Sequence, residues 1–218
     1  NEDYKLREAV RKASIYTTII VAPIALALIV FAEPITWLIY GEAYKLAPIY
    51  LALLALQGLL TPLGLYVIGN YFNAIGATTI TMRVRIFSTC IVAPLATIMI
   101  MNYGVIGLII SSFISNIAAM IYALYLANRK FSIRLNILDS VKALLAPVSA
   151  TIPTYMIMNI LGNNYCSICI AIIVYVILLA LTIPLFIHKT YLQNLKELTS
   201  ELKIIGSILS GILALELR

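Results

Sequence analysis

Two closely spaced arginines, Arg83 and Arg85, are the residues of this sequence best suited to bind an anion. They stand just inside an apolar run that continues as IFSTCIVAPLATIMIM. Residues two positions apart on a helix point about 200° away from each other, so at most one of them is expected to face an internal cavity. An inward guanidinium can hold a phosphate or diphosphate through two parallel hydrogen bonds. The alternative is that both arginines are anchors that reach lipid headgroups.

A line of polar side chains interrupts the preceding apolar run at Gln57, Thr61, Asn70 and Asn73. On a helix, Gln57 and Thr61 share a face at i, i+4, and Asn70 and Asn73 share one at i, i+3. If this line faces a water-filled cavity, then Gln57, Asn70 and Asn73 are predicted to bind substrate together with the arginines. Hydrogen bonds between helices use the same residue types, for under about 2 kcal/mol each, and are the alternative.

Acidic side chains are scarce, with nine Asp and Glu residues in the whole chain. Only Glu33 falls within an apolar run, roughly 27 Å from the start of that run at 1.5 Å per residue. Acids at membrane depth often take part in ion or proton coupling, so Glu33 is the candidate for that role. The alternative is that it reaches outer water beside Pro34. No cluster of acids suits an enzyme active site, and we predict no enzymatic function.

The other residues able to ligate or react do not form a site. Cys166 and Cys169 give a single CSIC motif with no second pair and no nearby histidine, which is weak evidence for zinc or redox chemistry. We expect these thiols and Cys90 to pack between helices. His188, the only histidine, is expected at a membrane interface. No metal site and no cofactor is predicted.

Composition indicates that these residues lie in a membrane. The 218 residues are 62% hydrophobic and 11% charged, whereas soluble domains are about 25% charged. Apolar stretches of roughly 17–25 residues match the thickness of a bilayer. The sequence therefore predicts an all-α integral membrane protein, a multi-pass bundle in the cell membrane. Its six spans are expected near residues 15–40, 46–69, 80–101, 105–127, 141–161 and 166–187.

The basic residues orient this bundle. With six spans, Lys45 alone falls on one face of the membrane and the other Lys and Arg residues fall on the opposite face, which the positive-inside rule makes cytoplasmic. The net charge of +6 thus comes from basic residues at the edges of the membrane, where anionic lipids attract them. We therefore exclude a nucleic-acid partner. In the tail, 189–218, leucines at helical spacing predict a short amphipathic helix on the membrane surface.

Three stretches carry features whose order, from residue 23 to residue 130, resembles that of a known family. They are VAPIALALIVFAEPITWLIYGEAYKLAPIYLALLAL, GNYFNAIGATTITMRVRI and MNYGVIGLIISSFISNIAAMIYALYLANRKF. Their order resembles the polysaccharide and lipid-linked oligosaccharide flippases of the multidrug/oligosaccharidyl-lipid/polysaccharide exporter superfamily. The second stretch looks like that family's L-N-A-x-G-x-T turn, and the third is similar to its P-x-Y-G-x-x-G-A-A-x-A-T hairpin. Asn102 and the segment 109–112 depart from that hairpin pattern.

The resemblance implies a transporter with two lobes of helices around a central cavity. This chain would form one lobe, the C-terminal half, and its partners would be the bilayer, a lipid-linked sugar and the missing N-terminal half. The implied activity is the movement of that sugar from the cytoplasmic to the outer leaflet. A drug or cation antiporter of the same superfamily, coupled through Glu33, and a non-catalytic structural membrane subunit are the alternatives.

Overall fold

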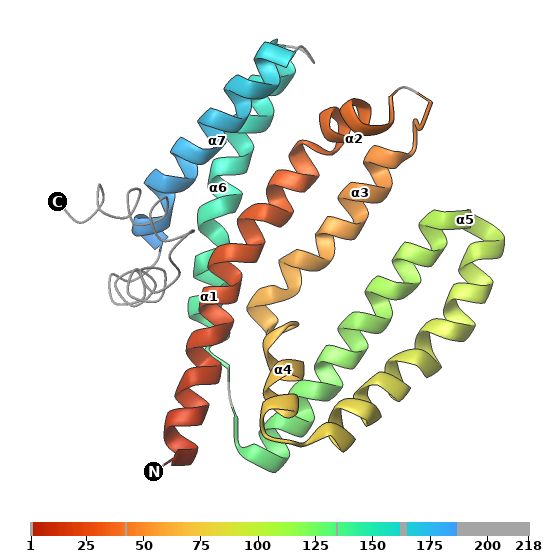
Figure 1. The fold of residues 1–218 in the computed structure, drawn as a ribbon, viewed down its shortest axis with the longest axis vertical. Helices are drawn as coiled ribbons and strands as arrows, with labels where there is room; N and C mark the ends of the chain where they lie inside the picture. The colour runs from red at the N-terminus through yellow and green to blue at the C-terminus, as the bar shows by residue number, and fades with distance from the viewer. Residues whose placement is uncertain (1, 42, 134, 162–164, 187–218) are drawn as a thin grey trace. The chain divides into compact units, whose positions relative to one another are not determined.

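The computed structural model describes residues 2–41, 43–133, 135–161 and 165–186, and all regular structure in this part of the chain is helical. Seven α-helices and one 3-10 helix are present there, without a strand (Figure 1). The predicted all-α class is therefore confirmed. The chain divides into two compact units, residues 1–140 and 141–218, each described below by itself. The predicted amphipathic tail at 189–218 lies outside the described residues.

The first apolar run forms two helices, where the sequence predicted a single span near 15–40. These helices are α1 (Glu2–Val30) and α2 (Ala32–Tyr40). The reason for the break is Pro34, which has no N–H to donate to the carbonyl of Val30. Helical bonding continues on either side of it, from the amide of Phe31 to the carbonyl of Ala27 at 2.8 Å and from Ile35 to Phe31 at 2.9 Å.

The second apolar run, predicted as a span near 46–69, is a broken helix. It consists of α3 (Ala47–Ala55), the 3-10 helix η1 (Leu56–Leu63) and α4 (Val67–Ala74), with a bend of 60° before α4. Pro62 cannot bond the carbonyl of Gly58, and the hydroxyl of Thr61 donates to that carbonyl instead, at 2.9 Å. Gly64, with φ of +85°, then turns the chain into α4.

The third and fourth predicted spans, near 80–101 and 105–127, together form α5 (Thr78–Phe131). Non-helical backbone at Gly104 (φ 58°, ψ −136°) folds α5 into a hairpin, whose two halves run side by side in Figure 1. The halves are tied where the hydroxyl of Ser115 donates to the carbonyl of Ser88 at 2.7 Å. Near the tip, Gly107 is buried against Met99, with no room for a Cβ atom.

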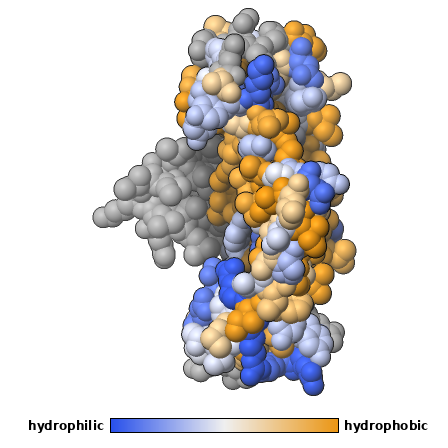
Figure 2. Space-filling view, turned by 90° about the vertical axis from the view of Figure 1, so that its right-hand side faces the viewer, coloured by the Kyte–Doolittle hydropathy of each residue, from blue (hydrophilic) through white to orange (hydrophobic). Residues whose placement is uncertain are grey.

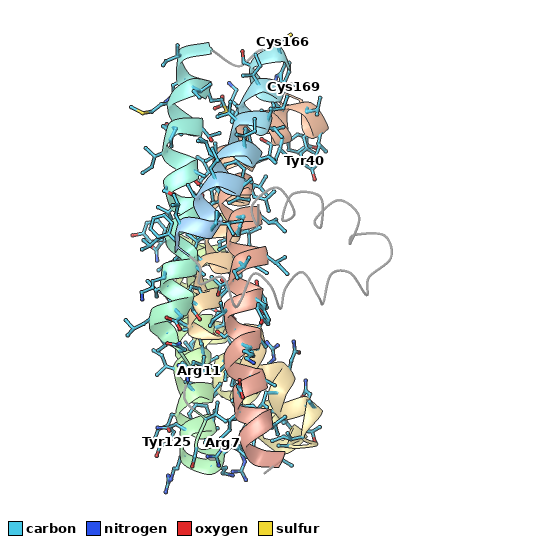
Figure 3. All side chains as sticks on the ribbon, turned by 90° about the vertical axis from the view of Figure 1, so that its left-hand side faces the viewer. Arg7, Arg11, Tyr40, Tyr125, Cys166 and Cys169 are labelled. Atoms are coloured by element: carbon cyan, nitrogen blue, oxygen red, sulfur yellow. The ribbon has the colours of Figure 1, made fainter. Side chains whose placement is uncertain are left out.

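Unit 1 has one end at which basic residues gather, named here the basic end. α1 begins there, and α5 both begins and ends there (Figure 1). Figure 3 places Arg7, Arg11 and Tyr125 at this end and Tyr40 of α2 at the opposite one. A hydrophobic core at the basic end joins α1, α4 and α5. It is made of Val10, Val67, Ile68, Tyr71, Phe72, Ile80, Ala123, Leu126, Ala127 and Ile133.

Unit 2 contains most of α6 (Ile137–Leu161) and α7 (Tyr165–Phe186), at the places of the last two predicted spans. The hydroxyl of Thr182 on α7 donates to the carbonyl of Ala146 on α6 at 3.1 Å. Ala146, Ala150 and Ala171 are completely buried. Small buried side chains allow the backbones of the two helices to approach each other closely, as is common between helices in membranes.

Among the described residues, four helical segments are long and apolar enough to cross a membrane: Leu6–Val30, Thr78–Phe131, Ile137–Ile160 and Cys166–Phe186. The bent pair Ala47–Leu63 and Val67–Ala74 would be a fifth if it counts as one span. In Figure 2, which views the α5 side of Figure 1, apolar residues predominate in the middle and hydrophilic residues gather toward both ends. This part of the chain therefore has the lengths and composition of a multi-pass membrane protein.

Candidate functional site

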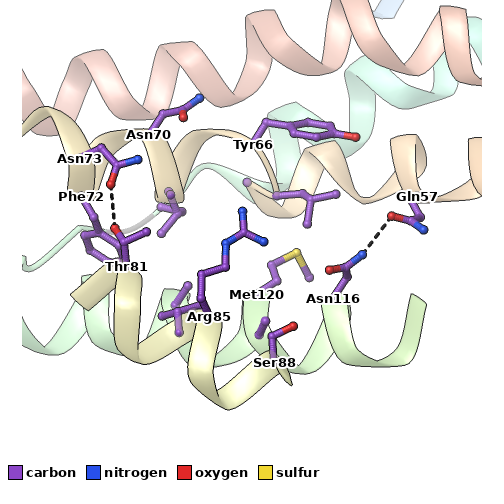
Figure 4. Close-up of a pocket in the computed structure, with 17 residues that line it drawn as sticks. Gln57, Tyr66, Asn70, Phe72, Asn73, Thr81, Arg85, Ser88, Asn116 and Met120 are labelled. Atoms are coloured by element: carbon purple, nitrogen blue, oxygen red, sulfur yellow. Dashed lines mark hydrogen bonds between the residues drawn. The ribbon is translucent and has the colours of Figure 1, made fainter. Parts of the chain in front are cut away.

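A cavity of 330 Å³ lies within unit 1 between η1, α4 and both halves of α5 (Figure 4). Its polar lining comes from side chains of all these elements, and Ile68, Phe72 and Met120 add an apolar wall. These three apolar residues are buried, and Ile68 and Phe72 belong to the core at the basic end. The cavity is therefore built on packed elements and is formed before any ligand arrives. The polar residues that line it are Gln57, Tyr66, Asn70, Asn73, Thr81, Arg85, Ser88 and Asn116.

Arg85 gives this cavity its charge. It stands seven residues after the start of α5, about 10 Å along the helix axis. In Figure 4 its guanidinium points into the space below Tyr66. No carboxylate lines the cavity, and among the described residues the Arg85 guanidinium has neither a hydrogen bond nor an ion pair. All of its donors are thus available to an anion that enters.

Amide side chains are fixed at both ends of the cavity. At the end near the start of α5, the hydroxyl of Thr81 donates to the Asn73 side-chain carbonyl at 2.9 Å. At the other end, the Asn116 amide donates to the Gln57 side-chain carbonyl, also at 2.9 Å (Figure 4). These bonds leave the NH₂ groups of Asn73 and Gln57 and the carbonyl oxygen of Asn116 facing a ligand. The cavity therefore offers one cation together with neutral donors and acceptors.

Four of the residues predicted to bind substrate line this one cavity: Gln57, Asn70, Asn73 and Arg85. The fifth, Arg83, is exposed and does not line it. The two arginines differ because their positions on α5 are about 200° apart, which leaves only Arg85 on the side of α4. Glu33, the residue predicted for ion coupling, is exposed in the first turn of α2 and does not line the cavity either.

Four polar lining residues were not among the predicted site residues: Tyr66, which is one turn from Asn70, and Thr81, Ser88 and Asn116. A signal for two of them was present, because Thr81, Arg85 and Ser88 follow one another at i, i+4 and i+7 and so share a helix face. Asn116 gave no such signal, because its partner Gln57 is 59 residues away in the sequence.

The remaining candidates form no site in the described residues. Cys90, Cys166 and Cys169 are exposed free thiols, where the sequence predicted packing between helices. No group of three or more His, Cys, Asp or Glu side chains that could hold a metal ion is found in this part of the chain. His188 lies outside it.

Comparisons with family models, with curated proteins and with solved structures found no match to this chain. The function is therefore argued from the cavity.

The bond between Gln57 and Asn116 makes a testable contribution to stability. We expect a double-mutant cycle of Gln57→Ala and Asn116→Ala to give a coupling energy of about 0.5–1.5 kcal/mol, the range for a single hydrogen bond between helices. Thermal unfolding of the four proteins in detergent measures it. Purely additive effects would mean that the two amides do not interact.

Proposed function

We propose that this chain is one lobe of a membrane transporter that moves a lipid-linked oligosaccharide, or a polysaccharide repeat unit, from the cytoplasmic to the outer leaflet by alternating access. The observation that carries the proposal is the cavity whose lining has a single charged side chain, Arg85. A cation with no acid beside it suits an anionic ligand, and the phosphate or diphosphate that joins lipid to sugar is such a group.

Placement in the bilayer is part of the proposal. Each half of α5 is about 39 Å long, sufficient for a hydrocarbon core of about 30 Å. With the halves of α5 counted separately and the bent pair counted once, the described helices give six spans. The basic end of unit 1 then faces the cytoplasm by the positive-inside rule. The part of the cavity lined by Asn73 and Thr81 lies nearest this end, where a lipid-linked precursor is made available.

Each part of the cavity has a role in this proposal. Arg85 holds the phosphoryl group, and the amides of Gln57, Asn70, Asn73 and Asn116 bond sugar hydroxyls. At 330 Å³ the cavity is at the small end of the range for ligand sites, so it receives only the part of the headgroup nearest the lipid. The lipid tails stay in the bilayer, and a second lobe encloses the remaining sugars while the two lobes rock against each other.

The antiporter hypothesis has less support. Coupling to an ion gradient requires an acid at the transport path, and the cavity has none in its lining. Glu33 lies on α2, apart from the lining residues.

Reconstitution tests the proposed function. The full-length protein that contains this chain is placed in liposomes with a fluorescent lipid-linked oligosaccharide, and a membrane-impermeant quencher measures how much of it reaches the other leaflet. We expect exchange well above that of empty liposomes. Exchange at the rate of empty liposomes would contradict the proposal.

A further inference from the structure

The α5 hairpin carries two further arginines, Arg83 and Arg129, that do not line the cavity. Phe87 and Tyr122, one from each half of α5, stack with ring centroids 4.9 Å apart and an angle of 42° between the rings. This contact fixes the register of the two halves on that face. Tyr122 and Arg129 share a helix face, because seven residues make two turns. Arg83 lies one turn from Phe87 on the other half.

Arg129 is held by its neighbour Tyr125. Its guanidinium donates to the Tyr125 hydroxyl at 2.9 Å and lies 5.9 Å from the centre of the Tyr125 ring. This contact uses one side of the guanidinium and leaves its other N–H groups available. Arg83 is exposed, and its guanidinium has no hydrogen bond or ion pair among the described residues.

The register places the two arginines within about 4.5 Å of each other along the axis of the hairpin. Arg83 lies four residues from Phe87 toward the basic end, which is about 6 Å along the helix axis. Arg129 lies seven residues from Tyr122 toward the same end, which is about 10 Å. Packed helices have axes about 8–10 Å apart. Side chains as long as arginine can therefore reach one anion between them. The whole of α5 contains no Asp or Glu, so no carboxylate of this helix competes for the two guanidinium groups.

We propose that Arg83 and Arg129 bind the phosphate of an anionic phospholipid in the leaflet at the basic end. Charge complementarity favours this occupant: two cations flank a phosphodiester, and the rings of Phe87, Tyr122 and Tyr125 contact its glycerol and upper acyl region. Tyrosine rings are common at this depth of a bilayer, and each basic residue near the surface strengthens the attraction of anionic lipid. The inference depends on the membrane placement of α5 but not on any transported substrate.

Lipid selectivity tests this site. The full-length protein is reconstituted in phosphatidylcholine with a trace of spin-labelled phosphatidylglycerol, and electron paramagnetic resonance measures the fraction of label immobilised at the protein. Spin-labelled phosphatidylcholine is the reference. We expect phosphatidylglycerol to be preferred, and we expect Arg83→Gln with Arg129→Gln to reduce that preference about thirtyfold, since each cation contributes about 1 kcal/mol and each 1.4 kcal/mol is a factor of ten.

A charge-matched control is Arg7→Gln with Lys130→Gln, two exposed basic residues of the same end outside the site. This control variant should keep most of the preference for phosphatidylglycerol over phosphatidylcholine. An equal loss in the two double variants would overturn the proposal, because the effect would then be that of general charge. Displacement of the labelled lipid by millimolar inorganic phosphate would also overturn it, in favour of a site for soluble anions. Neither result depends on whether the protein transports a sugar.

Discussion

Arg85→Gln should reduce leaflet exchange of a lipid-linked oligosaccharide by about tenfold to a hundredfold. A hydrogen bond to a charged group is worth about 1.5–3 kcal/mol, and each 1.4 kcal/mol is a factor of ten. Among the described residues, no other charged side chain lines the cavity, so the lining offers no second cation to replace the lost guanidinium. Initial rates in proteoliposomes, at a substrate concentration below saturation, measure the effect.

Two further variants make this result specific. Arg85→Lys keeps the charge but loses the planar fork that bonds two oxygens at once, so we expect an intermediate rate. Lys130→Gln removes one positive charge from the same helix outside the cavity and should leave the rate unchanged. Full activity of Arg85→Gln, or an equal loss in Lys130→Gln, would contradict the assigned role of Arg85.

Gly107→Ala should destabilise the protein by about 1–3 kcal/mol or more. A Cβ atom at Gly107 would overlap the backbone carbonyl of Met99 on the other half of the α5 hairpin. The obstacle is backbone, so no change of side-chain rotamer removes it. The two halves must move apart near the tip, which strains the bonds between Ser88 and Ser115. Thermal unfolding in detergent measures the loss.

The matched control for this substitution is Gly69→Ala in α4. No atom lies within 4 Å of a Cβ built there, and the residue is helical, so alanine should stabilise the helix by up to about 1 kcal/mol. Both changes add one methyl group, but only Gly107→Ala creates a clash. Unfolding temperatures that shift equally in the two variants would show that the halves of α5 do not pack as described.

Hydropathy predicted the positions of the helices but not the positions at which they break. Each predicted span overlaps an observed helix, because apolar runs of this length leave the backbone few alternatives in a membrane. The breaks at Phe31 and between η1 and α4 depend on single residues, chiefly Pro34, Pro62 and Gly64. Proline is also tolerated within α1 and α5, at Pro23 and Pro94, so its presence alone does not predict a break.

The sequence predicted only which site residues share a face of the same helix. Spacing alone indicated that at most one of Arg83 and Arg85 faces a cavity, but which one does so depends on how α5 is rotated against α4 and η1. That rotation is set by packing between distant segments. The bond between Gln57 and Asn116 is of the same kind, because neither residue indicates its partner.

The central claim is that unit 1 crosses the membrane with its basic end in the cytoplasm, so that the part of the cavity lined by Asn73 lies nearest the cytoplasmic side. Labelling of single cysteines tests it most directly: the three native cysteines are replaced by serine, and Asn73→Cys and Tyr103→Cys are introduced separately. Asn73 lines the cavity beside Thr81, near the start of α5, and Tyr103 lies at the opposite end of the first half of α5. A membrane-impermeant maleimide should label Asn73→Cys only from the cytoplasmic side and Tyr103→Cys only from the outer side. Labelling of both cysteines from the same side would contradict the account.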